Sequence, residues 1–332
     1  MNQIKDGHVL ILGDGNLSFS LAFVKQHAGD GVHFWCTVME SEAELINRYP
    51  TSRSNIDYLG AMPSVRLRFE TDATRLKLEW FDGQLFEHVV MNFPHPGGKT
   101  NLRKCRALLS GVFESIPAVL APAGRFLLSL APKQSGLSSP IGSVISSEVP
   151  AHNKDSWAVI YLASYSGFLL QFVANFDPRA YPGYTCTGYL SQSKGFHQTG
   201  SETMIFSRAA VLTASSLTAN EQELQYFDQL HPLRPYYLHD VSFWLLNEDA
   251  DHASLLKHWL VQLSGGLVKR LSPLPELQYK CSERNATSVV YRLVWQSHFA
   301  CLTRECCRDR QNLLRERITV VFSDERVPLE LR

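Results

Sequence analysis

The sequence has no excess of either charge, no CxxC pair and no long apolar run. Its 32 lysines and arginines balance 32 aspartates and glutamates, so a polyanion would have to bind a local patch rather than a global basic field. The seven cysteines are scattered and odd in number, which is typical of a reducing compartment rather than a disulfide framework. No segment approaches the ~20 apolar residues that span a bilayer, and the first residues lack a signal or transit pattern. We therefore expect no membrane partner and a cytoplasmic location, with the nucleus as the alternative.

The first two hundred residues alternate strand and helix signals. Val9–Leu12 is a continuous apolar run, as a parallel strand covered on both faces requires. Five βα units in all predict a parallel sheet wound by helices on both faces. The last two strands of this part are joined by a long loop without a clear helix, so we expect them to form an antiparallel pair. A Rossmann core closed in this way is the layout of class I methyltransferases.

A change in composition near residues 211–222, where Ser, Thr and Ala dominate, divides the chain. We predict a Rossmann domain over 1–210, a linker over 211–224 and a second domain over 225–332. The second domain has strand–helix signals of its own and ends in a helix that begins after Thr303. A βαββαβ ferredoxin-like module is the expected fold at this length. The predicted fold class is therefore α/β, followed by an α+β domain.

A glycine pair, Gly13 and Gly15, separates the first strand from the first helix. With an acid, Glu40, at the end of the next strand, this pair favours a nucleotide-like cofactor across the turn. Asp14 would repel the pyrophosphate of a dinucleotide at the helix N-terminus. A cofactor with a cationic sulfonium and an amino-acid tail meets no such penalty.

The acids after the strands have separate expected roles. Glu40 is placed to accept hydrogen bonds from both ribose hydroxyls. Asp72, after the third strand, would bind the adenine amino group, and a helix N-cap is an equally supported role for it. The predicted cofactor contacts are Gly13, Asp14, Gly15, Asn16, Ser18, Glu40 and Asp72.

The segment MNFPHPGGKT, residues 91–100, follows the fourth strand. It is not a phosphate loop, because Phe93 stands where that motif needs its first glycine. An amide and an aromatic ring held by a proline suit the binding of a flat heterocycle. The aromatic ring stacks on the heterocycle, and the amide forms hydrogen bonds with its edge. The predicted catalytic residues are Asn92, Phe93, Pro94 and His95. A strand-ending turn with a buried Phe93, and a purely structural His95, are the alternatives.

The second domain has no standard metal pattern. His298, Cys301, Cys306 and Cys307 have spacings that match no zinc site, so we expect no metal. Arginines recur along the last helix, but they are interleaved with acids, which is equally typical of a solvated helix face.

Both parts of the chain resemble known families. The strings ILGDGNLSFSLA, ETDAT, NFPHPGGK and YPGY, within residues 6–208, resemble the 25S rRNA (uridine-N(3))-methyltransferase-like family. The strings HDVSFWL, SVVYRLVW and LELR, within 230–332, resemble the ferredoxin-fold anticodon-binding domain that ends phenylalanyl-tRNA synthetases. The resemblance implies an S-adenosylmethionine-dependent methyltransferase acting on a uridine ring nitrogen of tRNA or rRNA, with the second domain binding tRNA. The residues expected near RNA are Lys99, Arg292, Arg308 and Arg315.

Two rival functions remain on the sequence alone. One is a catalytically inactive protein that binds RNA or another partner and retains the methyltransferase fold. The other is a nicotinamide-dependent oxidoreductase, which Asp14 in the glycine turn disfavours.

Overall fold

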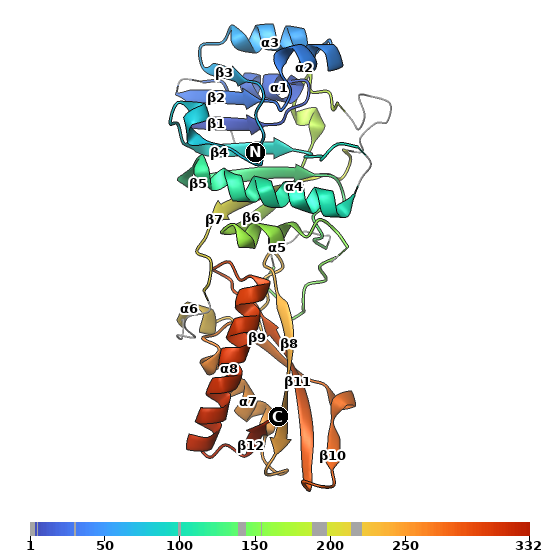
Figure 1. The fold of residues 1–332 in the computed structure, drawn as a ribbon, viewed down its shortest axis with the longest axis vertical. Coiled ribbons are helices and arrows are strands. Elements are labelled where there is room, and N and C mark those ends of the chain that lie inside the picture. Colours follow the sequence, from blue (N-terminus) through green and yellow to red (C-terminus); the bar gives the residue numbers. More distant parts are fainter. Residues whose placement is uncertain are drawn as a thin grey trace. The chain divides into compact units, whose positions relative to one another are not determined.

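A computed structural model describes residues 4, 6–29, 31–98, 101–138, 144–153, 155–187, 198–213 and 221–332. The chain forms two compact units (Figure 1). The first comprises Met1–Leu137 and His152–Arg208, and the second comprises Ser138–Ala151 and Ala209–Arg332.

The first unit is built on a seven-stranded sheet in the order β3-β2-β1-β4-β5-β7-β6. The first five strands along the chain pair in parallel, whereas β7 pairs antiparallel with both β5 and β6. The strands are β1 (Gly7–Leu12), β2 (Val32–Thr37), β3 (Val65–Arg68), β4 (Phe86–Asn92), β5 (Leu120–Leu130), β6 (Phe168–Asn175) and β7 (Glu202–Arg208). The predicted antiparallel pair is confirmed, and this is the class I methyltransferase-like Rossmann arrangement.

Helices cover both faces of this sheet, because its strands are apolar on both sides. One face, with Val9 and Ile11, packs in a core with α1, α2 and α3. On the other face, Phe113 of α4 packs edge-on against Phe126 and Phe206. The helices are α1 (Ser18–His27), α2 (Glu42–Arg48), α3 (Ser52–Gly60), α4 (Leu102–Ser115) and α5 (Val159–Tyr165), with 3-10 turns η1 (Leu78–Phe81), η2 (Ile116–Ala118) and η3 (Pro178–Ala180).

The second unit has the ferredoxin-like strand order. β12, β8, β11 and β9 are neighbours in that order, all antiparallel, and β10 extends the edge beside β11. Its elements are α6 (Glu221–Leu224), β8 (Tyr237–Leu245), α7 (His252–Leu263), β9 (Val268–Pro273), η4 (Pro275–Leu277), β10 (Tyr279–Cys281), β11 (Ala286–Trp295), α8 (Arg304–Asp324) and β12 (Leu329–Leu331). Thr303 caps α8 by accepting a hydrogen bond from the Cys306 amide at 3.2 Å, as the sequence predicts.

The predicted linker over 211–224 is too long. Its last four residues form α6, where Glu223 is buried and receives a hydrogen bond from the Lys269 ammonium at 2.6 Å. The Ser297 hydroxyl and the His298 amide donate to the same carboxylate. A carboxylate that satisfies three buried donors fixes α6 within the second unit.

A second difference from the sequence prediction is the excursion Ser138–Ala151, which belongs to the second unit. Ser146 and Leu230 exchange both backbone hydrogen bonds, at 3.1 and 2.6 Å, and Arg270 donates to the Ser147 carbonyl. The chain therefore enters the second unit once between β5 and α5 and again after β7.

Candidate functional site

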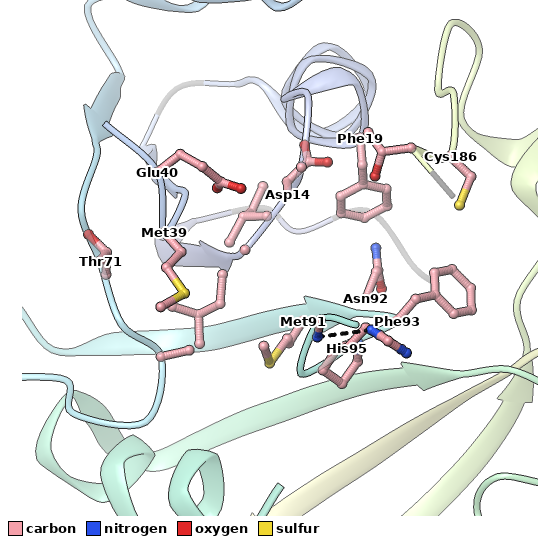
Figure 2. Close-up of a pocket in the computed structure, with 18 of the residues that line it drawn as sticks. Asp14, Phe19, Met39, Glu40, Thr71, Met91, Asn92, Phe93, His95 and Cys186 are labelled. Atoms are coloured by element: carbon pink, nitrogen blue, oxygen red, sulfur yellow. Dashed lines mark hydrogen bonds between the residues drawn. The ribbon is translucent and has the colours of Figure 1, made fainter. Parts of the chain in front are cut away.

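A cavity of about 740 Å³ opens at the carboxyl ends of β1 and β4 (Figure 2). In open α/β sheets, ligands bind at this edge. Of the predicted site residues, it collects Gly13, Asp14, Gly15, Glu40, Asp72, Asn92, Phe93, Pro94 and His95. Asn16 and Ser18 do not line it, and Lys99 lies outside the described residues.

The glycine turn is held against the end of β2. The amides of Gly13 and Asp14 both donate to the Thr37 carbonyl, at 2.9 and 3.3 Å. Gly13 has φ +65°, a conformation that glycine adopts without steric cost, and a Cβ there would approach only the Met91 methyl group. The turn therefore brings backbone to the cavity edge without side-chain bulk.

The Asp14 carboxylate caps the helix that follows. It accepts a hydrogen bond from the Ser20 amide at 2.6 Å, in the first turn of α1, whose N-cap residue Leu17 provides no side-chain bond. Burial raises the pKa of Asp14 to about 6, and the bond to Ser20 limits the rise. At neutral pH this group is mostly an anion, and it faces the cavity (Figure 2).

Asn16 and Ser18 bind residue 185 and do not line the cavity. Asn16 Nδ2 donates to the Thr185 hydroxyl at 3.0 Å, and the Ser18 hydroxyl donates to the Thr185 carbonyl at 3.0 Å. A Cβ at Gly15 would lie 2.7 Å from the Thr187 hydroxyl. The sequence therefore needs glycine at 15 so that residues 185–187 can close over the turn.

The two acids after β2 and β3 both reach the cavity, with partners of their own. Glu40 pairs with Arg48, which lines the same cavity. Asp72 accepts from both the amide and the hydroxyl of Thr74, at 2.9 and 2.7 Å. Asp72 therefore caps the backbone, as in its alternative role. The segment that it caps is a turn rather than a helix, because no α-helix follows before η1.

Asn92 presents an unsatisfied donor to the cavity. Its Nδ2 atom is buried and has no hydrogen-bond partner among the described residues, and Figure 2 shows the amide pointing into the cavity between Asp14 and Phe93. A buried amide nitrogen without a partner costs free energy unless a ligand or a solvent molecule satisfies it. The end of β4 is therefore built to donate a hydrogen bond into the cavity.

Phe93 is held in a strained conformation beside this donor. Its φ is +51°, and its amide donates to the Ser129 carbonyl at 2.8 Å. The ring packs edge-on against Phe176 at 5.0 Å. A non-glycine residue in this region is uncommon and concentrates at functional sites.

His95 holds its own loop. Its Nδ1 accepts a hydrogen bond from the Gly97 amide at 3.0 Å (Figure 2), which assigns the proton of the neutral ring to Nε2. Burial lowers the pKa of His95, so the ring is neutral at pH 7. In this arrangement the ring is a hydrogen-bond donor through Nε2, which fits the structural alternative better than a general base.

Several cavity residues carry no sequence signal that singles them out. Tyr184 follows the YPGY glycine and packs edge-on against Phe19 at 5.6 Å, which closes the cavity beside α1. This motif gives the one usable signal, because paired aromatics around a glycine mark a packed turn. The other missed lining residues include Met39, Arg48, Thr71, Met91, Gln134, Cys186 and Thr187.

The arginines expected near RNA have local partners. Arg292 forms a two-bond pair with Asp240, its cross-strand neighbour, with both distances 2.8 Å. Arg308 pairs with Asp309, and Arg315 donates to the Arg332 carbonyl. Arg310, between them on α8, is buried and donates to the Thr213 carbonyl. The arginines of α8 therefore do not form one continuous basic face.

Among the described residues, no helix has both the length and the apolar character needed to cross a bilayer. Within the same residues, no group of three or more His, Cys, Asp or Glu side chains is arranged to hold a metal ion.

A family model described as "rRNA (uridine-N3-)-methyltransferase BTM5-like" matches residues 10–188. Two curated relatives are similar in sequence. The ferredoxin-fold anticodon-binding domain-containing protein 1 homolog of Mus musculus is 34% identical over 202 residues, and its Homo sapiens counterpart is 32% identical over 203. Each match covers 60% of this chain and 31% of the relative, so the chain spans about a third of the length of these relatives.

Solved structures resemble the chain more remotely. A putative methyltransferase from Thermoplasma acidophilum aligns with TM-score 0.35 and 9% identity, covering 62% of this chain and 70% of that one. The glycopeptide N-methyltransferase MtfA with S-adenosylmethionine aligns with TM-score 0.37 and 17% identity, covering 62% and 89%. Both scores lie below 0.5, and the fold assignment rests on the strand order instead.

Proposed function

The chain belongs to the BMT5-like family of rRNA (uridine-N3-)-methyltransferases, and from this premise we propose that it methylates N3 of a uridine in tRNA, with rRNA as the alternative substrate. S-adenosylmethionine is the cofactor of this family. The observation that carries the proposal is the unsatisfied Asn92 amide beside the strained Phe93, at the edge of a cavity that also contains the glycine turn.

The cavity residues fit this cofactor. A volume of about 740 Å³ lies within the range of small-molecule sites. Gly13 and Gly15 would lie under the amino-acid tail, Glu40 would accept from the ribose, and Asp72 would lie near the adenine. The cofactor supplies a methyl group on a cationic sulfur, and the Asp14 anion favours that charge.

The chain's own residues would prepare the uracil. Methylation at N3 replaces the N3–H bond with an N3–methyl bond, so the weakly acidic imide proton must pass to solvent as the methyl group leaves the cofactor sulfur. Negative charge then develops on the ring and its carbonyl oxygens. Asn92 Nδ2 is placed to donate a hydrogen bond to a carbonyl oxygen, and this contact strengthens as the charge develops. His95 would not take this proton, because its Nδ1 atom accepts a hydrogen bond from the Gly97 amide. Phe93 would stack on the extruded base.

The second unit would hold the RNA through the sheet face that its helices leave uncovered. Phe243 of β8 stacks on Phe322 of α8, so the alternate residue Trp244 points to the opposite face. Two arginines, Arg284 and Arg332, lie over the Trp244 ring at 5.4 and 5.3 Å. Arginine on an aromatic ring suits contacts with phosphates and bases. Arg284 also pairs with Glu330 at 3.3 Å, as Arg308 pairs with Asp309 on α8, but this face adds an aromatic ring to its two arginines.

Nucleoside mass spectrometry of tRNA and rRNA from cells with and without the protein tests the proposal. We expect 3-methyluridine to fall in one RNA class, and that class identifies the substrate. A change confined to ribose methylation or to a purine would exclude the mechanism. No change in any nucleoside, together with retained RNA binding, would favour a catalytically inactive RNA-binding protein.

The RNA surface is tested in the full chain by comparing two exposed arginines. Arg284→Gln should weaken tRNA binding and reduce its salt dependence, because one phosphate contact is lost. Arg308→Gln on α8 is the matched control and should leave both unchanged. The reverse result would place the RNA on α8. If neither variant changed tRNA binding, RNA binding by this unit would be contradicted.

A further inference from the structure

A second cavity, of about 320 Å³, lies at the opposite end of the strands of the first unit. His8 and His33 are the second residues of β1 and β2 and face each other in register, with their rings stacked at 5.1 Å. The glycine turn follows the other end of β1. The two cavities share no lining residue within the described part of the chain, so this one belongs to a different site.

The walls of the second cavity are aromatic and rigid. Trp35 packs edge-on against Phe81 at 5.3 Å, and Phe81 packs edge-on against Phe86 at 5.2 Å. Trp35 and Phe81 line the cavity together with the imidazole rings of His8 and His33. Because the Trp35 and Phe81 rings lie at 86° to each other, a flat ligand ring can stack on Trp35 but not on Phe81 as well.

The polar groups of this cavity have both donors and acceptors. Arg66 lies opposite Trp35 in the sheet, with its guanidinium 5.8 Å from the indole ring, and it forms no ion pair with any described residue. Asp82 is the one acid among the described residues of the lining, and Gln84 adds an amide. His8 Nδ1 is buried and has no partner within the described part of the chain. A buried ring nitrogen in that state requires a polar atom from a ligand or solvent.

We propose that this cavity binds a single purine nucleobase with the edges of guanine. A guanidinium fork matches the two acceptors O6 and N7 of guanine, and a carboxylate matches the donors on its opposite edge. An adenine would place a donor amino group toward Arg66, and a bare phosphate would meet Asp82 with like charge. The base can come from RNA, given the proposed substrate, or from a free nucleotide.

Calorimetry on the full chain with GMP, AMP, UMP and inorganic phosphate tests this site directly. We expect GMP to bind with the highest affinity. Arg66→Gln should weaken GMP binding about tenfold, and Asp82→Asn should remove the preference for GMP over AMP. Asparagine tolerates the φ of +54° at position 82, so the backbone there is kept. Arg53→Gln, an exposed arginine that lines neither cavity, is the control and should bind GMP normally.

Equal binding of GMP and UMP, dominant binding of inorganic phosphate, or equal effects of Arg66→Gln and Arg53→Gln would overturn the proposal. S-adenosylmethionine binding is measured in parallel and should be unchanged in all three variants. A loss of cofactor binding at the first cavity is thereby distinguished from a loss of GMP binding at the second. A raised KM for RNA with unchanged kcat in Arg66→Gln would identify an RNA base as the occupant. Lost GMP binding with an unchanged KM for RNA would identify a free nucleotide.

Discussion

At the scale of single residues, the site combines groups whose local partners restrict what they can do. Asp14 caps α1 and still faces the cavity as an anion, whereas the Nδ1 atom of His95 is occupied by the Gly97 amide. The sequence predicts that these residue types gather, but it does not predict which atom of each is bound to the backbone. Hydrogen bonds to the backbone decide that, and they depend on turn geometry that no spacing specifies.

Asp14→Asn should keep the cap and remove the charge. The variant is expected to lose affinity for S-adenosylmethionine by on the order of 1 kcal/mol. It should bind S-adenosylhomocysteine, which has the same tail but a neutral sulfur, as before, because only the sulfonium gains from the anion. Calorimetry with both ligands at pH 7.5 checks this. An equal loss for both ligands would show that Asp14 acts through the fold of the turn.

The same variant should change the pH dependence of stability. The folded-state pKa of Asp14 is about 6, above its usual 3.8, so the folded protein holds this proton more tightly than the unfolded chain. The contribution of Asp14 to stability therefore decreases as the pH rises from about 4 to 6. Denaturant unfolding across this range should show that the free energy of unfolding of Asp14→Asn increases relative to that of the native protein as the pH rises. A constant difference between the two proteins would contradict the raised pKa.

Asn92→Ala should raise stability and abolish most activity. Removing a buried donor that lacks a partner among the described residues relieves a cost of about 1 kcal/mol in the ligand-free protein. Methyl transfer should fall about a hundredfold, as for loss of one donor to a developing oxyanion. Thermal unfolding and single-turnover assays measure the two effects. Lower stability with unchanged turnover would mean that Asn92 is structural.

At the scale of elements, the sequence predicts the features that depend on local pattern. The glycine turn after β1, the NFPHPGG loop after β4 and the Thr303 cap of α8 are where the sequence places them. Residues 102–124 alone favour one long helix, but α4 ends at Ser115 and Leu120–Gly124 belong to β5. The pair of Arg292 with Asp240 could not be predicted either, since it depends on a strand register that cannot be read from one strand.

Gly15 offers a test of how the turn and residues 185–187 fit together. Gly15→Ala should weaken S-adenosylmethionine binding, because the added methyl group would lie 2.7 Å from the Thr187 hydroxyl. Adding Thr187→Gly removes that group and should restore binding. Gly60→Ala is the control, since outside its own helix no described residue has an atom within 4 Å of a Cβ there. Failure of the double variant to recover would place the effect in the backbone of the turn.

At the scale of the whole molecule, the two units are interleaved along the chain rather than joined by one linker. Ser138–Ala151 leaves the first unit and pairs with Leu230 in the second. Composition could not predict this interleaving, because Ser146 and Leu230 are 84 residues apart and their pairing leaves no periodic pattern in the sequence. Gln134, which lines the first cavity, lies four residues before this excursion. A chain cut after residue 212 therefore lacks the partner of Ser146.

Hydrogen exchange at the Ser146 amide tests this organisation. In the full chain the amide donates to the Leu230 carbonyl at 3.1 Å and should exchange slowly. In residues 1–212 it should exchange at the rate of an unstructured amide. Equal protection of the Ser146 amide in both proteins would mean that this amide is protected within the first unit.

The proposed activity is tested most directly by incubating the full chain with unmodified tRNA or rRNA and S-adenosylmethionine bearing an isotope-labelled methyl group. The RNA is then digested and its nucleosides are resolved by mass spectrometry, with Asn92→Ala as the matched control. We expect labelled 3-methyluridine, strongly reduced with the variant. Label in another nucleoside, or none at all from a protein shown to bind S-adenosylmethionine, would contradict it.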